Sequence, residues 1–266
     1  MSNLLKKNTL NFIYIFCLGA ISSYSLPPYN YFIINFITFS LFFIFLFNRK
    51  KELPNNKFFF RYGWHFGFGY FLFSLYWVVI SLTFDQSFKF LIPVALILLP
   101  AFLGIFYGLI TYLFSIFYSK NIISSFFIFS ILFGIFEFIR GSILTGFPWN
   151  LIAFSFSKNL YFIQILSIIG TYSFNLVCIS FFTAPALFIL RNSRKEIIVF
   201  IIIILISVGF LIFGNIKNSN FDSLENIKNS YKIKAISPNI SLDRFYSKKD
   251  ELKIINELIE LSAPTK

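Results

Sequence analysis

The sequence predicts a polytopic α-helical membrane protein of about seven transmembrane helices, followed by the first strand and helix of an incomplete α/β domain. Three observations predict this architecture. Apolar residues make up 57% of the 266 residues and charged residues only 13%, with a mean hydropathy of +0.76. Apolar runs long enough to approach or cross a bilayer recur along residues 9–213. After residue 214 the composition becomes polar, as in a segment outside the membrane.

Each apolar segment is bounded by charged, polar or proline-containing residues. Spans are expected near residues 9–25, 31–47, 58–84, 90–118, 122–141, 160–190 and 197–213, which together form a membrane domain over residues 1–214. The turn Leu26–Asn30 makes a short hairpin of the first two. Gly63 and Gly67, four residues apart, let a neighbouring helix approach the third span closely. Pro93 and Pro100 predict a kink or a broken first turn in the fourth.

The basic residues orient these spans. With a cytoplasmic N-terminus, eleven Lys and Arg fall in inside segments and three in outside segments between spans. This excess predicts an N-terminus in the cytoplasm and, after seven spans, a C-terminal tail on the opposite side. The net charge of +12 is therefore assigned to membrane orientation, and nucleic acid is excluded as a partner. Lys6 and Lys7 also suit a signal peptide, but the further apolar runs indicate an uncleaved first span.

An ion-pair candidate lies at the end of the fifth apolar run. Glu137 and Arg140 are three residues apart, which places them on one face of a helix. Charges at membrane depth are costly, so both are expected to point inward, at each other or at a polar cavity. Two interpretations stay open. The pair either helps to shape a lipid-headgroup or acyl-chain entry, or it is a structural ion pair.

The loop after this pair is the most distinctive segment of the chain. Gly141, Gly146 and Pro148 interrupt the helix, and Phe147 lies between the last two. Trp149 suits a membrane–water boundary. A rigid turn with an aromatic tip beside an ion pair is typical of a built site, although an ordinary interfacial loop has the same composition.

Few other residues carry chemistry. Cys17 and Cys178 lie inside apolar runs and are interpreted as small core residues, with no disulfide framework and no metal site. The lone His65 is interpreted as a hydrogen-bonded or interfacial residue.

The tail differs in kind from the membrane domain. Residues 215–230 form a polar linker, residues 231–237 alternate as a strand does, and residues 250–261 carry a helical apolar stripe. One strand and one helix cannot make a stable domain, because the strand leaves backbone groups unpaired on both edges. The tail, residues 231–266, is therefore interpreted as the first β–α unit of a truncated α/β domain.

Three motifs together resemble the apolipoprotein N-acyltransferase family. The sequence E-x-x-R-G at residues 137–141 precedes T-G-F-P-W at residues 145–149. The glycine-containing run at residues 67–71 leads to Trp77-Val-Val-Ile-Ser81, which is similar to the W-x-x-V-S of the family. The segment Ala235-Ile-Ser-Pro-Asn239-Ile240 is similar to the start of the nitrilase-like domain of that family.

The resemblance implies a bacterial inner-membrane enzyme with seven spans, a periplasmic nitrilase-like domain and a last span. It implies transfer of an acyl chain from a phospholipid donor to the N-terminal diacylglyceryl-cysteine of an apolipoprotein acceptor. A cysteine thiolate would be the nucleophile, a glutamate the base, and a lysine would stabilise the oxyanion. The implied chemistry needs neither a metal nor a soluble cofactor.

The chain departs from the family in the part that carries the chemistry. The catalytic Glu, Lys and Cys implied by the resemblance would follow residue 266, and Glu257 and Glu260 are not assigned to that role. The chain as given is therefore expected to be inactive alone. Ser237 replaces the usual Gln, and the aromatic residue expected to line the lipid entry aligns best with Tyr246, with Phe245 as the alternative.

Two other functions compete with the acyltransferase. A polytopic transporter would place intramembrane charges on several helices and show paired broken helices, whereas this chain concentrates its charges in the fifth span. A non-catalytic lipid-binding scaffold remains compatible with the membrane domain alone.

Overall fold

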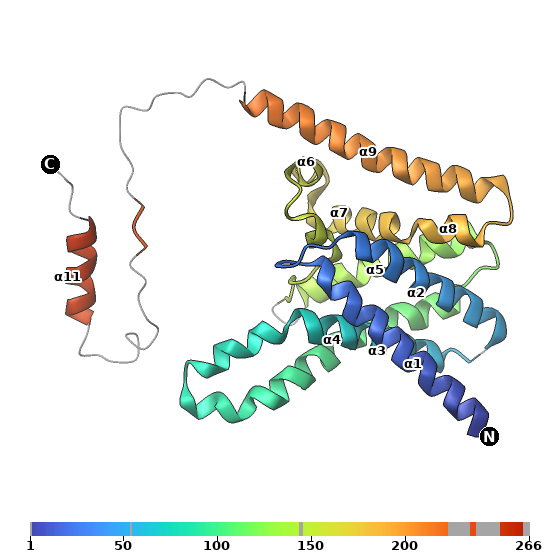
Figure 1. The fold of residues 1–266 in the computed structure, drawn as a ribbon, viewed down its shortest axis with the longest axis horizontal. Coiled ribbons are helices and arrows are strands. Elements are labelled where there is room, and N and C mark those ends of the chain that lie inside the picture. Colours follow the sequence, from blue (N-terminus) through green and yellow to red (C-terminus); the bar gives the residue numbers. More distant parts are fainter. Residues whose placement is uncertain (1, 54, 144–145, 223–234, 238–250, 263–266) are drawn as a thin grey trace.

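The computed structural model describes residues 2–53, 55–143, 146–222, 235–237 and 251–262, and these are almost entirely helical (Figure 1). The α-helices are α1 (Ser2–Ser22), α2 (Ile33–Glu52), α3 (Lys57–Ser74), α4 (Ile92–Phe117), α5 (Ile122–Ser142), α6 (Leu160–Ile163), α7 (Leu166–Thr183), α8 (Pro185–Leu190), α9 (Arg194–Asp222) and α11 (Glu251–Ser262). The 3-10 helices are η1 (Ser23–Ser25), η2 (Tyr76–Thr83), η3 (Gln86–Leu91) and η4 (Ile152–Phe156).

The described residues contain five helices long and apolar enough to cross a membrane, or six if the bent pair α3 and η2 is one span. The membrane prediction is confirmed at this level, whereas the count of seven is not. The first expected span, near residues 9–25, is a shorter apolar helix, Thr9–Ser25. The third bends by 49° between α3 and η2. The sixth begins as the separate short helix α6, and Gly170, at φ +73°, interrupts α7.

The predicted close approach at the glycines of α3 is confirmed. A Cβ atom on Gly63 would lie 2.1 Å from both the Tyr107 carbonyl oxygen and Thr111 Oγ1 on α4. The Thr111 hydroxyl also donates a 2.6 Å hydrogen bond to the Phe59 carbonyl across the two helices. Small residues at a helix contact in lipid permit such backbone proximity, which maximises packing and interhelical hydrogen bonding.

Aromatic rings fill the centre of the bundle. The rings of Phe42 on α2 and Phe66 on α3 stack with centroids 4.2 Å apart, and Phe133 on α5 meets Tyr107 on α4 edge to face at 5.1 Å. All four side chains are fully buried. The high phenylalanine content, 42 residues of 266, therefore supplies the bulk of an interdigitated core.

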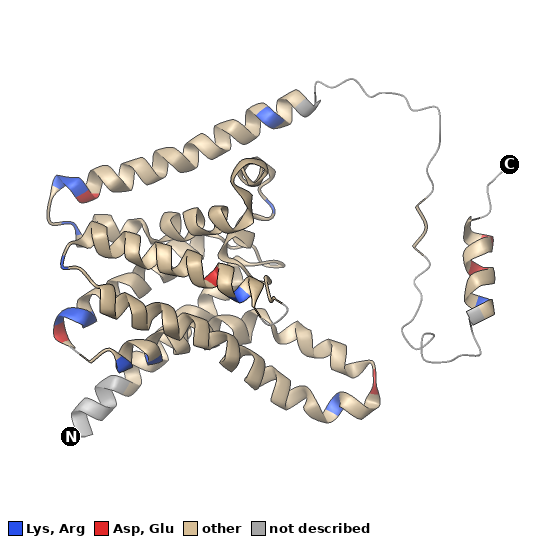
Figure 2. Cartoon of the chain, turned by 180° about the vertical axis from the view of Figure 1, so that it is seen from behind, with Lys and Arg blue, Asp and Glu red and all other residues tan. Residues whose placement is uncertain are grey.

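Basic residues gather at one end of the bundle (Figure 2). The loops between α2 and α3, between α4 and α5, and between α8 and α9 lie there. The turn between α1 and α2, the loop after α5 and the short helix α6 lie at the other end (Figure 1). The segregation agrees with the alternation of charge along the sequence.

The tail is described in part. Helix α11 (Glu251–Ser262) covers residues 251–261 of the helix expected at residues 250–261 (Figure 1), and residue 250 lies outside the described residues. Helix α9 continues to Asp222, so the first part of the expected linker is helical. Of the strand expected at residues 231–237, only residues 235–237 are described, and they have no regular secondary structure. Asn239 and Tyr246 lie outside the described residues.

Candidate functional site

The guanidinium of Arg140 is the centre of the hydrogen bonding at the end of α5. Arg140 and Glu137 are each 1% exposed, and Arg140 Nη2 donates to Glu137 Oε2. Arg140 Nη1 donates to two carbonyl oxygens of the following loop, Phe147 at 2.6 Å and Trp149 at 3.0 Å. The guanidinium carbon also lies 5.2 Å from the centre of the Phe71 ring. The predicted inward-facing pair is confirmed, and it fixes the loop as well as itself.

The turn that brings the loop back to Arg140 requires glycine. The Phe147 amide donates to the Arg140 carbonyl at 3.1 Å, which folds the chain against the end of α5. Gly146 adopts φ +80°, a conformation that residues with a Cβ rarely adopt. A Cβ on Gly141 would lie 1.9 Å from the hydroxyl of Tyr172 on α7. The two glycines therefore let the loop and α7 close around the end of α5.

The loop is held on its other side by the end of α3. Asn150 Nδ2 donates to the Ser74 carbonyl at 3.1 Å, and the Tyr70 hydroxyl donates to the Asn150 carbonyl at 2.9 Å. Trp77 Nε1 donates to the same Ser74 carbonyl at 3.1 Å. The rings of Trp77 and Trp149 then lie with their centroids 5.2 Å apart. The loop after α5 is thus clamped between α3 and α5.

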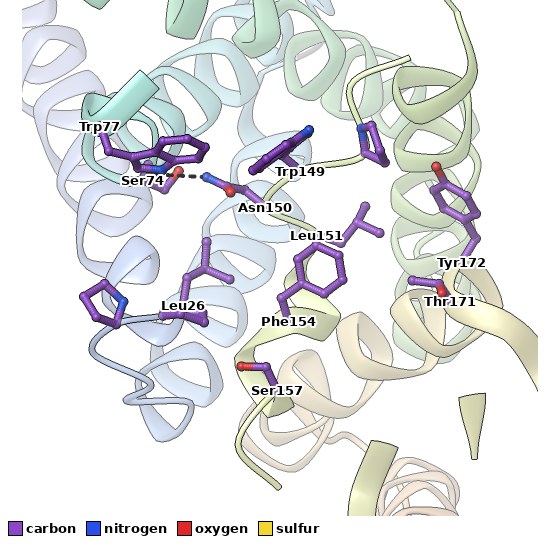
Figure 3. A pocket seen from close by; sticks show the side chains of 13 residues that line it. Leu26, Ser74, Trp77, Trp149, Asn150, Leu151, Phe154, Ser157, Thr171 and Tyr172 are labelled. Atoms are coloured by element: carbon purple, nitrogen blue, oxygen red, sulfur yellow. Dashed lines mark hydrogen bonds between the residues drawn. The ribbon is translucent and has the colours of Figure 1, made fainter. Parts of the chain in front are cut away.

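A largely apolar cavity of about 780 Å³ opens beside this loop (Figure 3). Trp149, Leu151 and Phe154 face it from the loop and η4. Leu26, in the turn between α1 and α2, lines one side, and Tyr172 on α7 lines the other (Figure 3). Apolar walls with few polar groups are typical of a site that takes an apolar ligand.

A buried cluster of hydrogen-bonded polar side chains joins the elements next to the cavity. Asn35 at the start of α2 accepts a 2.6 Å hydrogen bond from Ser22 and donates to Ser25 at 2.8 Å and to Ser155 at 3.0 Å. All four residues are buried. They join the end of α1, the start of α2 and η4, and these elements flank segments that line the cavity.

The structure divides the predicted site residues into two groups. Glu137, Arg140, Gly141, Gly146 and Phe147 form the buried support of the loop. Pro148 and Trp149 instead line the cavity, and Trp149 is 52% exposed.

Sequence reasoning missed the walls that come from elsewhere in the chain. Pro27 and Pro28 were interpreted only as a turn, and Phe154 and Asn35 carried no signal.

The remaining candidates have ordinary surroundings. The ring of His65 stacks on Phe12 with centroids 4.6 Å apart, and its Nδ1 lies 2.7 Å from the Arg61 carbonyl. Cys178 is buried and Cys17 is exposed, and both are free thiols. In the described part of the chain, no group of three His, Cys, Asp or Glu residues lies together to hold a metal ion.

The site lies within a region that known proteins share. A family model, the apolipoprotein N-acyltransferase N-terminal domain, matches residues 18–184, well over half of the chain. The chain belongs to this family. The matched region includes the Arg140 loop and every segment that lines the apolar cavity, whereas α9 and the tail follow it.

Curated apolipoprotein N-acyltransferases resemble the chain over its membrane part or beyond. The protein of Rhizobium etli (strain CIAT 652) is 34% identical over 184 residues, which is 66% of this chain and 34% of the relative. That of Rhodopseudomonas palustris is 28% identical over 257 residues, 92% of this chain and 46% of the relative. That of Brucella melitensis biotype 1 is 27% identical over 255 residues, which is 93% of this chain and 47% of the relative. The chain therefore spans about a third to a half of the length of these apolipoprotein N-acyltransferases.

Proposed function

We propose that this chain is the membrane half of an apolipoprotein N-acyltransferase, and that its apolar cavity receives an acyl chain of the phospholipid donor. The observation that carries the proposal is the cavity of about 780 Å³. It opens within the region that the family model matches, at the end of the bundle opposite the basic loops. Its tryptophan, phenylalanine, leucine and tyrosine walls suit a hydrocarbon chain more than a hydrated ion.

The proposed reaction has two steps. A cysteine thiolate attacks the ester carbonyl of the phospholipid, and a lysophospholipid leaves as a thioester forms. The α-amine of the diacylglyceryl-cysteine then attacks the thioester, an amide bond forms, and the thiol is released. By resemblance to the family, the thiol, its glutamate base and the oxyanion-stabilising lysine would belong to the nitrilase-like domain, and the membrane domain is proposed to bind and position the lipid. The acceptor is the diacylated apolipoprotein.

Arg140 and Glu137 are proposed to act as positioning residues. Arg140 is 1% exposed and its guanidinium donates to Glu137 and to the loop carbonyls, which supports a role in holding the loop more than direct contact with a lipid phosphate. Trp149, which the loop presents to the cavity, is the residue proposed to touch the lipid. The structural interpretation of the ion pair thereby gains support, and its effect on the lipid passes through the loop.

The orientation follows from the charge distribution. We propose that the basic end of the bundle faces the cytoplasm of a bacterial inner membrane, which places the cavity and the tail on the periplasmic side. The tail at residues 231–266 is proposed to be the start of a nitrilase-like domain, with Asn239 in its first loop and Tyr246 lining the lipid entry.

Mass spectrometry of lipoprotein N-termini tests the proposed activity. We expect lipoproteins to carry the N-acyl group in cells that have the gene, and to accumulate with a free α-amine after its deletion. Re-expression of the gene with its native downstream sequence should restore the N-acyl group. Unchanged N-acylation after deletion would contradict the proposal and leave the transporter and the non-catalytic lipid-binding scaffold as the alternatives.

A further inference from the structure

A second cavity, of about 450 Å³, lies next to the apolar one and has a different chemical character. The two cavities share the segment just after η4, because Ser157 lines the first cavity and the next residue, Lys158, lines the second. Its lining combines the ammonium of Lys158, the side-chain amides of Asn30, Asn159 and Asn218 and the hydroxyls of Ser155 and Tyr161 with the apolar side chains of Phe32, Phe156 and Leu160. A cavity with a lysine in its wall thus adjoins the apolar one, which has no charged residue in its lining.

Lys158 lies outside the loops that hold most of the basic residues. The loops that collect Lys and Arg lie at the opposite end, whereas Lys158 follows η4 beside α6. Its side chain is exposed, and among the described residues no ion pair includes it. A cation without a protein carboxylate at a membrane boundary can bind an anion from outside the chain.

The side-chain amides of Asn30 and Asn159 differ in their hydrogen bonding, and the Asn30 nitrogen already donates to the Pro28 carbonyl at 2.8 Å. The side-chain oxygen of Asn159 accepts the Phe162 amide at 3.0 Å, and Asn159 lines the cavity. The side-chain oxygen of Asn30 accepts from Ser157 at 3.3 Å, which ties the turn between α1 and α2 to the wall between the cavities. An ammonium beside an amide nitrogen suits phosphate oxygens, which accept and do not donate.

We propose that the second cavity binds a phosphate group through Lys158 and Asn159, and that this phosphate is a phospholipid headgroup whose acyl chain occupies the apolar cavity. The phosphate chemistry stands on the cavity alone, whereas the assignment to a lipid rests on the proposed function. A phospholipid carries its phosphate at the boundary and its chains beside it, and the two cavities provide adjoining places for these parts.

Native mass spectrometry of the 266-residue chain, released from detergent micelles, tests the site with matched ligands and variants. Binding of phosphatidylglycerol is compared with binding of a diacylglycerol that has the same acyl chains and no phosphate. The test variant is Lys158→Gln. The control is Lys89→Gln in η3, another exposed lysine, which lines neither cavity. Inorganic phosphate is added as a competitor in a parallel series.

Lys158→Gln is expected to weaken phosphatidylglycerol binding about tenfold, as loss of a charge-assisted contact does, with no change for diacylglycerol. Lys89→Gln should bind both lipids as the parent does, and Lys158→Arg should keep most of the affinity. If millimolar inorganic phosphate binds to the lipid-free protein as well as phosphatidylglycerol does, the site is assigned to free phosphate. If binding of the phosphate group requires the attached acyl chains, the site is assigned to the lipid.

Two results would overturn the site: equal phosphatidylglycerol affinity in Lys158→Gln and the parent, or an equal loss of diacylglycerol binding in that variant. The readout is independent of acyl transfer. Normal N-acylation in gene-deleted cells with Lys158-dependent lipid binding would defeat the proposed function and leave the phosphate site. Loss of N-acylation in gene-deleted cells, together with lipid binding that does not depend on Lys158, would defeat the phosphate site and leave the proposed function.

Discussion

Replacing Arg140 with Gln is expected to lower the free energy of unfolding by about 3–5 kcal/mol, the usual effect of breaking a buried ion pair. Three groups lose their partner at once: the buried Glu137 carboxylate and the carbonyl oxygens of Phe147 and Trp149. The measurement is the midpoint of thermal unfolding in detergent, followed by gel filtration of the folded fraction.

The control for this prediction is a second pair with the same three-residue separation. Arg49 and Glu52 form a 2.7 Å ion pair, but the Glu52 side chain is 61% exposed. Arg49→Gln is therefore expected to change the free energy of unfolding by less than about 1 kcal/mol. The double variant Glu137→Gln/Arg140→Gln should recover part of the loss, because it leaves no buried charge. Equal unfolding midpoints for Arg140→Gln and Arg49→Gln would contradict the assigned role of Arg140.

Replacing Gly63 with Leu is expected to separate α3 from α4 and to reduce the folded fraction sharply. The new Cβ would lie 2.1 Å from the Tyr107 carbonyl oxygen, a backbone atom that cannot turn aside. Overpacking of this kind costs about 1–3 kcal/mol or more, and the hydrogen bond from Thr111 to the Phe59 carbonyl would be lost with it. The measurement is the yield of monodisperse protein together with its thermal midpoint.

Gly209 provides the matched control, because a Cβ there meets no atom within 4 Å. Gly209→Leu on α9 should leave the yield and the midpoint close to those of the parent. If both leucine variants behaved alike, the close contact between α3 and α4 would not hold the bundle together.

Local features of the bundle could be predicted from the sequence because their causes are local. The three-residue separation of Glu137 and Arg140 places them on one helix face. Because charged side chains are costly in lipid, both side chains are expected to point into the bundle. Gly63 indicates a close helix contact by its lack of a side chain. The alternation of basic segments along the chain anticipated the charged end of the bundle.

Features that depend on contacts between distant segments could not be predicted. The chain bends after Ser74, and the Ser74 carbonyl accepts a hydrogen bond from the side-chain amide of Asn150, which lies 76 residues later in the sequence. Arg140 satisfies loop carbonyls whose approach depends on the turn at Gly146. The cavity requires the turn at residues 26–28 to lie near Tyr172, and no sequence pattern relates the two.

Replacement of the membrane domain in a complete relative tests the central claim most directly. Residues 1–222 of this chain are joined to the remainder of the Rhizobium etli apolipoprotein N-acyltransferase, and the chimera is expressed in cells depleted of their own enzyme. The control carries the relative's own membrane domain rejoined at the same junction. We expect mass spectrometry to find N-acylated lipoproteins with both proteins. A chimera that reaches the control's level in the membrane and leaves the lipoproteins with free α-amines would contradict the account.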